Sequence, residues 1–179
     1  PAAGSPEIAQ EIVDTVAPVW VGLDHDSWGL DHGTWSVLAH MYPDADVPVV
    51  QLSIDASKPA DYHVGLGAAL EPLRRRGVLI VASGNVVHNL GRLAWGHPEA
   101  AYDWAVEFDE EAQRIMTQAP DEVLSLFGHR AYQLASPTPD HFLPLVYLAG
   151  LASAAGTTCE KLIGGYALGS LSMSSYALR

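Results

Sequence analysis

Residues 47–82 read VPVVQLSIDASKPADYHVGLGAALEPLRRRGVLIVA, and this stretch decides the fold class. It begins with an apolar run at residues 47–54 and ends with a second one at residues 78–82. Between the two runs a helix is predicted over residues 57–76, with Gly77 ending it. Strands that are apolar throughout and alternate with helices are typical of a parallel or mixed sheet with helices on both faces. The sequence therefore predicts an α/β fold with such a central sheet.

The same alternation continues outward from this stretch. A helix that Ser5 caps is predicted to lead into a buried strand at residues 19–23, and another helix starts at Thr34. On the other side the pattern predicts helices at residues 98–118, 121–126 and 140–154, followed by β-rich segments at residues 160–168 and 170–178. The 179 residues are the size of one domain, and the sequence contains no repeat or linker that would divide it.

Composition excludes several classes of protein. Apolar residues make up 49% and charged residues 17%, which excludes a disordered chain and a coiled coil. The formal net charge of −12 argues against binding to nucleic acid or to an anionic membrane surface. Cys159 is the only cysteine, so neither an internal disulfide nor a thiolate zinc site is available. No apolar run is long enough to span a membrane, and we expect a soluble, cytoplasmic protein.

Histidines are the residues most in need of an explanation, because there are eight of them against nine lysines and arginines. His88 lies in Ala82-Ser-Gly-Asn-Val-Val-His-Asn89, directly after a predicted buried strand. Open α/β sheets bind their ligands beyond the carboxyl ends of their strands, so this loop is a candidate site. The alternative is a histidine that only hydrogen-bonds within its own loop.

Two more histidines stand in comparable positions. His32 lies in Asp31-His-Gly-Thr-Trp35, where the glycine allows a ligand to approach closely; the alternative is a capping turn before Thr34. His141 follows two prolines in Ser136-Pro-Thr-Pro-Asp140, so it would be rigidly presented, as a metal site requires; the alternative is an ordinary histidine at a helix start.

The other histidines are weaker candidates. His25 lies between Asp24 and Asp26, but adjacent residues rarely point at one ion, so a histidine-rich metal hydrolase built on them is a minor hypothesis. His63 is expected to be structural. The remaining three are interpreted as surface or loop residues: His40, His97 and His129. The common nucleotide-binding, serine-hydrolase and zinc-protease signatures are absent.

In combination the motifs are far more specific than any one of them. Asp31-His-Gly-Thr-Trp, Ala82-Ser-Gly-Asn-Val-Val-His-Asn and Pro137-Thr-Pro-Asp-His-Phe-Leu-Pro, in this order, resemble the class III extradiol ring-cleavage dioxygenases. The branch that looks most similar is that of the DOPA 4,5-dioxygenase-like proteins. Residues 49–55 and the terminal Gly169-Ser-Leu-Ser-Met173 resemble the same branch, so the resemblance covers nearly the whole chain.

This resemblance implies an enzyme that inserts O₂ into a catechol ring, such as that of DOPA, at a non-haem Fe(II), with zinc described for some members. Its fold would be that of the protocatechuate 4,5-dioxygenase beta subunit. By the same resemblance His141 is a metal ligand, and His88 is a catalytic acid–base that some members use as a ligand. His32 matches a second acid–base histidine. A homo-oligomer is expected because dimers are common in such families.

The resemblance also identifies what this chain does not contain. In the family the first two metal histidines belong to N-terminal segments, and no histidine here lies in a matching His-Gly-Ser-Pro-like motif. We therefore expect residues 1–179 to be the C-terminal portion of one dioxygenase domain, with the other ligands supplied by a segment not included or by a separate chain. The alternative is a non-catalytic remnant or binding module that has lost the metal site.

Overall fold

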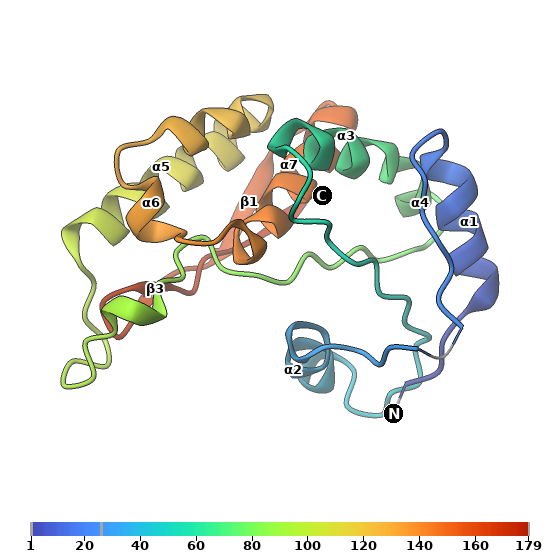
Figure 1. Ribbon diagram of the computed structural model, residues 1–179, viewed down its shortest axis with the longest axis horizontal. Coiled ribbons are helices and arrows are strands. Elements are labelled where there is room, and N and C mark those ends of the chain that lie inside the picture. The colour runs from blue at the N-terminus through green and yellow to red at the C-terminus, as the bar shows by residue number, and fades with distance from the viewer. Residues whose placement is uncertain (1, 26, 179) are drawn as a thin grey trace.

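The computed structural model describes residues 2–25 and 27–178. Its helices, where η marks a 3-10 helix, are α1 (Pro6–Val16), α2 (His32–Met41), α3 (Ala60–Ala69), α4 (Glu71–Arg74), η1 (Leu90–Arg92), α5 (Asp103–Gln118), η2 (Pro120–Gly128), α6 (Tyr132–Ala135), η3 (Pro139–His141) and α7 (Leu143–Ala154). Its strands are β1 (Cys159–Ile163), β2 (Tyr166–Ala167), β3 (Leu171–Ser172) and β4 (Ser175–Leu178). The result is a mixed α/β structure in which helices dominate (Figure 1).

Helix α7 lies at the centre of the molecule, because it is apolar around its circumference and contributes to both parts of the core. It packs closely against α3 at two glycines. A Cβ at Gly67 would overlap the carbonyl oxygen of Tyr147, and one at Gly150 would overlap the carbonyl oxygen of Val64. Glycine at both contacts therefore allows the two helix backbones to approach more closely than larger side chains would permit.

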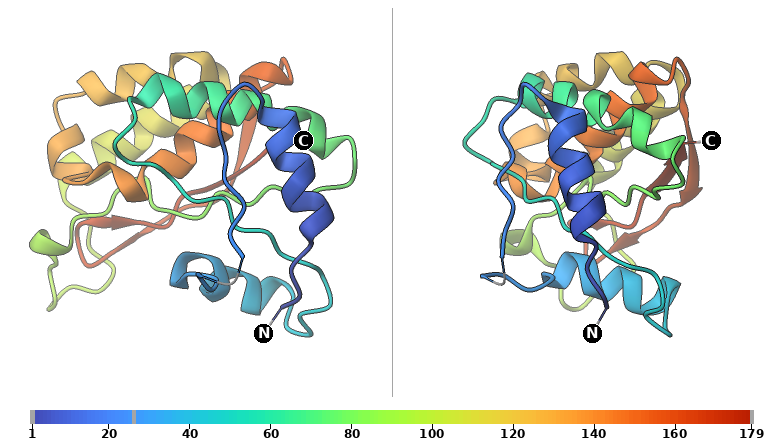
Figure 2. Two further views of the ribbon diagram at one scale, coloured as in Figure 1. Left: turned by 45° about the vertical axis from the view of Figure 1, so that its right-hand side comes forward. Right: turned by 90° about the vertical axis from the view of Figure 1, so that its right-hand side faces the viewer.

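The core has two parts that meet at α7. The first is aromatic and lies between α7, α5 and η2, with Phe108 and Phe142 completely buried. The second is aliphatic and joins α7 to α1 and α3 through residues such as Val16, Leu66 and Leu151. Because α7 is buried on all sides by these two clusters, the helices form the rigid support on which the loops are mounted (Figure 2).

The predicted central sheet is the main point on which the structure differs. Residues 19–23, 47–54 and 78–82 form no ladder with any described residue, and the sheets present are the two antiparallel pairs β1–β4 and β2–β3. No backbone–backbone hydrogen bond joins residues 50–54 or 79–82 to another part of the described chain. An apolar segment becomes a strand only when a neighbouring backbone satisfies its N–H and C=O groups, and here no such neighbour is described.

Two of these segments nevertheless keep the one-sided pattern of a strand. Val78 and Ile80 pack on the aliphatic cluster, whereas Leu79 and Val81 are 61% and 43% exposed. Residues 47–54 pack on the same cluster in the same alternating way, through Val50, Leu52 and Ile54. The sequence predicted strands that are apolar on both faces, whereas in the structure one face packs on the cluster and the other is exposed.

The predicted helices are present with shifted boundaries. The helix expected at residues 57–76 is divided into α3 and α4 next to Pro72, since proline cannot donate a hydrogen bond within a helix. The one expected at residues 121–126 is the 3-10 helix η2, and the one at residues 140–154 is η3 followed by α7. The two predicted β-rich segments are confirmed as the strands β1 to β4, which pair Cys159 with Leu178 and Tyr166 with Ser172.

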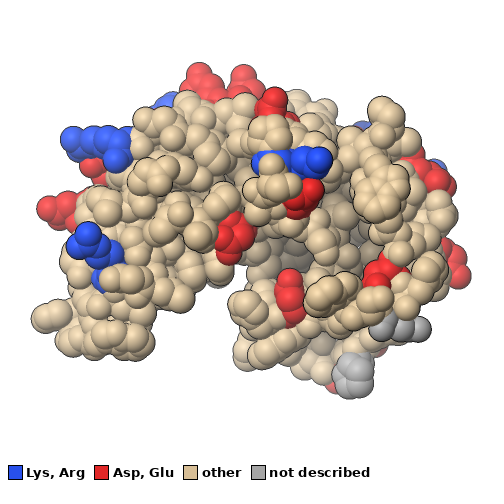
Figure 3. All heavy atoms as spheres, viewed as in Figure 1, with Lys and Arg blue, Asp and Glu red and all other residues tan. Residues whose placement is uncertain are grey.

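Helix α2 stands away from the helices of the core in all three ribbon views (Figures 1 and 2). None of its residues is buried. Seen as spheres, the molecule is hollowed between α2 and the part of the chain around η1 (Figure 3). The helices among residues 2–25 and 27–178 are all too short or too polar to cross a membrane.

Candidate functional site

The loop that carries His88 lies against the 3-10 helix that carries His141. Gly84 makes this approach possible, because a Cβ there would overlap the carbonyl oxygen of His141 and lie 2.8 Å from Cγ of Pro144. One residue further on, the Asn85 N–H donates to the same His141 carbonyl at 2.9 Å. The loop is thereby fixed to the start of the central helix α7.

The imidazole rings of His88 and His141 are stacked on each other. Their centroids are 3.7 Å apart and their planes differ by 7°. Both residues are half-buried, and the His141 side chain retains 33% of its exposure. Two of the three histidines that the sequence singled out are thus brought together, whereas their roles stay predictions.

Asp140 completes this pair on one side. Its Oδ2 lies 2.6 Å from Nδ1 of His141. The hydroxyl of Thr138 and the neighbouring His141 hold the pKa of the Asp140 carboxyl below its ordinary value, so it is ionised at neutral pH. Nδ1 of His141 is nevertheless buried without a hydrogen-bond partner among the described residues, so the contact is electrostatic; a carboxylate this close favours the imidazole proton on Nδ1 and leaves the lone pair on Nε2. The sequence reasoning did not single out Asp140, although its position directly before His141 was the signal that could have identified it.

His88 is held in its neutral form. Burial, and secondly the proximity of His141, lower the pKa of His88 below its ordinary value of 6.5. Asp140 acts in the opposite direction with a smaller effect. A neutral imidazole can accept a proton or bind a cation at neutral pH, and the stacked pair therefore offers the donor type that transition metals prefer.

His32 lies at the first position of α2, exposed to solvent, and Asp31 caps that helix by accepting the Thr34 N–H at 2.8 Å. Hydrogen bonds join this turn to the two segments that lack a strand partner, residues 47–54 and, at its end, 78–82 (the unpaired segments). Gln51 accepts the Asp31 N–H at 2.9 Å, and the Ser83 hydroxyl donates to the Gly33 carbonyl at 2.7 Å. No hydrogen bond, ion pair or ring contact joins His32 to the stacked pair in the described part of the chain.

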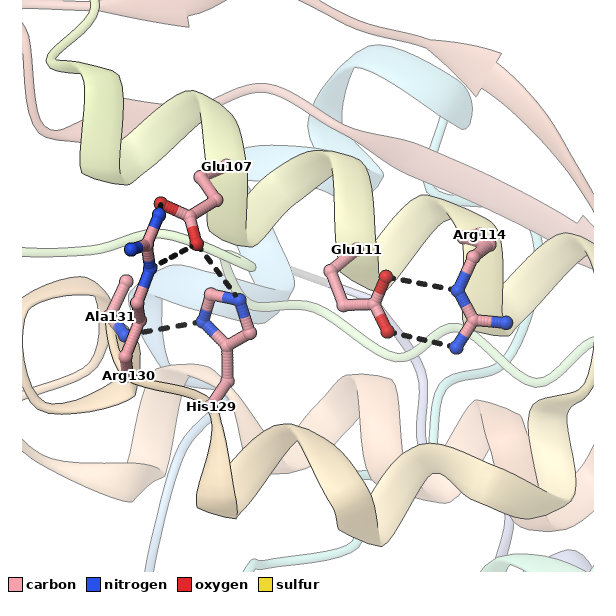
Figure 4. A network of polar contacts seen from close by, with 6 residues as sticks. All are labelled: Glu107, Glu111, Arg114, His129, Arg130 and Ala131. Atoms are coloured by element: carbon pink, nitrogen blue, oxygen red, sulfur yellow. Dashed lines mark hydrogen bonds and ion pairs between the residues drawn. The ribbon is translucent and has the colours of Figure 1, made fainter.

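Two further histidines have structural surroundings. His63 is completely buried, and its Nδ1 lies 3.2 Å from the Tyr147 hydroxyl, which joins α3 to α7 as a structural residue would. His129 lies 3.4 Å from Glu107, which also pairs with Arg130 at the surface (Figure 4). The interpretation of His129 as a surface or loop residue agrees with that position.

The Asp24 and His25 pair is part of a turn. The carboxylate of Asp24 accepts the N–H groups of Ser27 and Trp28, as a turn residue does. Asp26, the third residue of that hypothetical metal site, lies outside the described residues. Nothing in the turn therefore adds support to a metal hydrolase.

As a metal site the pair is suitable in chemistry and incomplete in number. Among residues 2–25 and 27–178 no group of three or more His, Cys, Asp or Glu is arranged to hold an ion. An ion bound through an imidazole nitrogen lies close to the plane of that ring, and two stacked, nearly parallel rings do not share such a position. The arrangement therefore fits one imidazole ligand from this pair, with the other ring beside it.

Taken together, the fold and the site define a mixed α/β protein with two stacked imidazoles, one of them next to a carboxylate. The family model described as the catalytic LigB subunit of aromatic ring-opening dioxygenase matches residues 1–176. The chain belongs to this family.

Individual relatives agree with the family match. A protein of Escherichia coli (strain K12) named 4,5-DOPA dioxygenase extradiol is 46% identical over 179 residues, which are 98% of this chain and 66% of the relative. A Beta vulgaris protein of the same name is 36% identical, with the same two shares. The crystal structure of an uncharacterized Escherichia coli K12 protein superposes with a TM-score of 0.89 at 44% identity, covering 98% of this chain and 73% of that one. The chain thus spans 66% of the length of these curated relatives.

Proposed function

We propose that this chain forms the larger part of an extradiol dioxygenase that opens the ring of a catechol such as DOPA. The observation that carries the proposal is the stacked His88–His141 pair, with Asp140 behind it, in a chain of the ring-opening dioxygenase family. The printed names of the relatives from Escherichia coli and Beta vulgaris support DOPA as the substrate class.

In the proposed site His141 is a metal ligand through Nε2, because Asp140 occupies the side of Nδ1. A bound non-haem Fe(II), or zinc as the alternative ion, would supply a Lewis-acidic centre at which the catechol and O₂ meet, and iron would also supply redox chemistry. The parallel rings support assigning His88 to proton transfer and not to the same ion.

The proton chemistry falls to the histidines. His88 is neutral at neutral pH and half-buried beside His141, so a ring nitrogen can accept the proton of a catechol hydroxyl. The resulting imidazolium holds that proton and returns it when the ring opens. We assign the second acid–base role to His32, which the Gln51 and Ser83 contacts of its turn hold at the end of both unpaired segments.

The remaining ligands come, in this proposal, from a segment outside these 179 residues. The relatives are longer, and residues 50–54 and 79–82 have unpaired backbones with apolar side chains on one face. A strand that paired with these segments would complete the central α/β sheet and bring further histidines toward His141.

One observation favours a different function. The described residues contain no group of three metal-binding side chains. A non-catalytic remnant of this fold that has lost its metal site would have the same arrangement. The two hypotheses differ in metal content, since a remnant would purify without metal at every pH at which imidazole is neutral.

The test is anaerobic reconstitution of the full natural chain with Fe(II), followed by L-DOPA and air while the visible spectrum is recorded. We expect a yellow ring-opened product. His141→Ala should lose both iron and product, whereas His88→Gln should keep the iron and slow the reaction by about 100-fold or more. The exposed His97→Gln is the control and should match the unaltered protein. Absence of both metal and product would support the remnant, and iron retained by His141→Ala would refute the assigned ligand.

A further inference from the structure

The two-residue strand β3 is the backbone partner of the segment that carries His88. The Val87 N–H donates to Oγ of Ser172 at 3.1 Å, and the Ser172 N–H donates to the Val87 carbonyl at 3.1 Å. Beyond the histidine, the Asn89 N–H donates to the Ser170 carbonyl at 3.1 Å, and the Ser170 hydroxyl donates to the Asn89 carbonyl at 2.7 Å. The backbone on both sides of His88 is therefore joined to the hairpin, whereas the His88 N–H itself donates to the Ala135 carbonyl of α6 at 2.7 Å.

Strand β3 needs support from outside its own sheet. Its ladder within the sheet is with β2, through Tyr166↔Ser172 and Ala167↔Leu171, and outside the sheet it has one bridge, from Leu171 to His88; so small a ladder is marginal in water. The hairpin also turns through Leu168 and Gly169, both of which have positive φ angles, of 51° and 81°. A non-glycine residue in that conformation is costly unless the surroundings hold it there.

Backbone hydrogen bonds to residues 94–102 hold the turn at Leu168 and Gly169, and Asp109 on α5 supports the two ends of the hairpin. Its side chain is buried, at 1% exposure, and its Oδ2 accepts the Ser174 hydroxyl at 2.8 Å and the Tyr166 hydroxyl at 3.3 Å. Tyr166 is at the start of the hairpin and Ser174 lies just past its end. The other carboxylate oxygen is buried without a hydrogen bond to the described residues, so the donors converge on one atom.

The charge of this carboxylate is compensated locally. Nζ of Lys161 lies 3.4 Å from Oδ2 of Asp109 and donates to Gln113 at 2.8 Å. Burial, and then the charge of Asp109, raise the pKa of Tyr166 to about 12, so its hydroxyl keeps the proton that it donates. A buried carboxylate with an ionic partner and hydroxyl donors is a strong and directional anchor.

We propose that Asp109 is a positioning residue, which holds the β2–β3 hairpin through Tyr166 and Ser174 and thereby sets the place of His88. Its catalytic consequence rests on the proposed dioxygenase function, whereas the positioning itself does not. Asp109 touches neither His88 nor His141 and acts only through the hairpin.

The test is amide hydrogen exchange at Val87 and Asn89, compared with the amide of Ala149 in the core of α7. Ser174→Ala and Tyr166→Phe each remove one hairpin donor and leave the carboxylate in place. We expect exchange at Val87 and Asn89 to become about tenfold faster or more in each variant, with a much smaller change at Ala149. Asp109→Asn should accelerate exchange at the same two amides, and by a larger factor.

The control is Glu111→Gln, which removes a carboxylate from the surface of the same helix, where it pairs with Arg114 (Figure 4). It should leave exchange at Val87 and Asn89 unchanged. Equal acceleration at Val87, Asn89 and Ala149 in Ser174→Ala and Tyr166→Phe would show a purely structural role and overturn the proposal, even if Asp109→Asn fails to fold.

Kinetics of the iron-loaded full chain give a second readout. Ser174→Ala should lower kcat several-fold with little change in KM for L-DOPA. The reason is that the histidine displaced by this substitution, His88, transfers a proton and does not bind the ring. A chain that opens no catechol would contradict the proposed function and leave the exchange experiment to decide the role of Asp109. Faster local exchange with unchanged kcat would overturn the catalytic consequence alone.

Discussion

His63 links the stability of the fold to pH. It is completely buried beside Tyr147, and burial lowers the pKa of His63 below its ordinary value of 6.5. In the unfolded chain the imidazole regains that ordinary value, so below it the unfolded state binds more protons than the folded state. The free energy of unfolding therefore falls as the pH drops below 6.5, until the folded-state pKa is passed.

We expect His63→Gln to make the decrease in unfolding free energy between about pH 7 and about pH 5 shallower. Urea unfolding at a series of pH values measures it. The control is His40→Gln on the exposed side of α2, which should keep the slope of the unaltered protein. Identical slopes in all three proteins would rule out His63 as a source of the pH dependence.

The sequence could predict single residues of the site but not their geometry. His88 and His141 were identifiable because one follows an apolar run and the other follows two prolines. The stacking of their rings and the contact of Asp140 with Nδ1 depend on a close approach at Gly84, which only the folded chain provides. The same holds for Asp109. It lies in an amphipathic helix, where an aspartate is expected on the exposed polar face, and only the folded structure shows that it is buried.

At the scale of elements, the close contact between α3 and α7 depends on glycine, which has no side chain, at positions 67 and 150. We expect Gly150→Ala to lower the free energy of unfolding by about 1–3 kcal/mol, because its Cβ would overlap the backbone of α3. Gly65→Ala is the matched control, since a Cβ there meets nothing within 4 Å. The control should be neutral or stabilise by up to about 1 kcal/mol through helix propensity. Urea midpoints measure both, and equal effects would show that helix propensity alone is being measured.

The elements themselves were predictable to different degrees. Helices are made by contacts within one segment, so the longer ones followed from the sequence, with shifted ends and a division next to Pro72, whereas the short α6 and η1 were not predicted. Strands need a partner from elsewhere in the chain. Residues 47–54 and 78–82 have the composition of strands buried on both faces and lack that partner among the described residues, so the pattern predicted apolar segments here but neither their exposed face nor the absence of pairing.

At the scale of the whole molecule, the unpaired segments lead to a prediction about a longer chain. In the 179-residue chain the amides of residues 50–54 and 79–82 should exchange rapidly, since no hydrogen bond joins them to another described backbone. In the longer chain that the proposed function requires, the same amides should be protected by about 100-fold or more, if a further strand pairs with them. Exchange followed by mass spectrometry measures both, with α7 as a segment protected in each. Equally fast exchange in the two proteins would rule out a strand at this place.

The hairpin that holds His88 has a consequence for the order in which the protein is made. The partners of Val87 and Asn89 are Ser172 and Ser170, which leave the ribosome more than eighty residues later. The helical core can assemble while this loop is held only by its earlier backbone partners, the carbonyls of Ala135 and His141. Chains that stop before residue 170 would retain most of the core and lack the Ser170 and Ser172 contacts on either side of His88, so an early stop codon would give a folded protein in which this histidine is less firmly held.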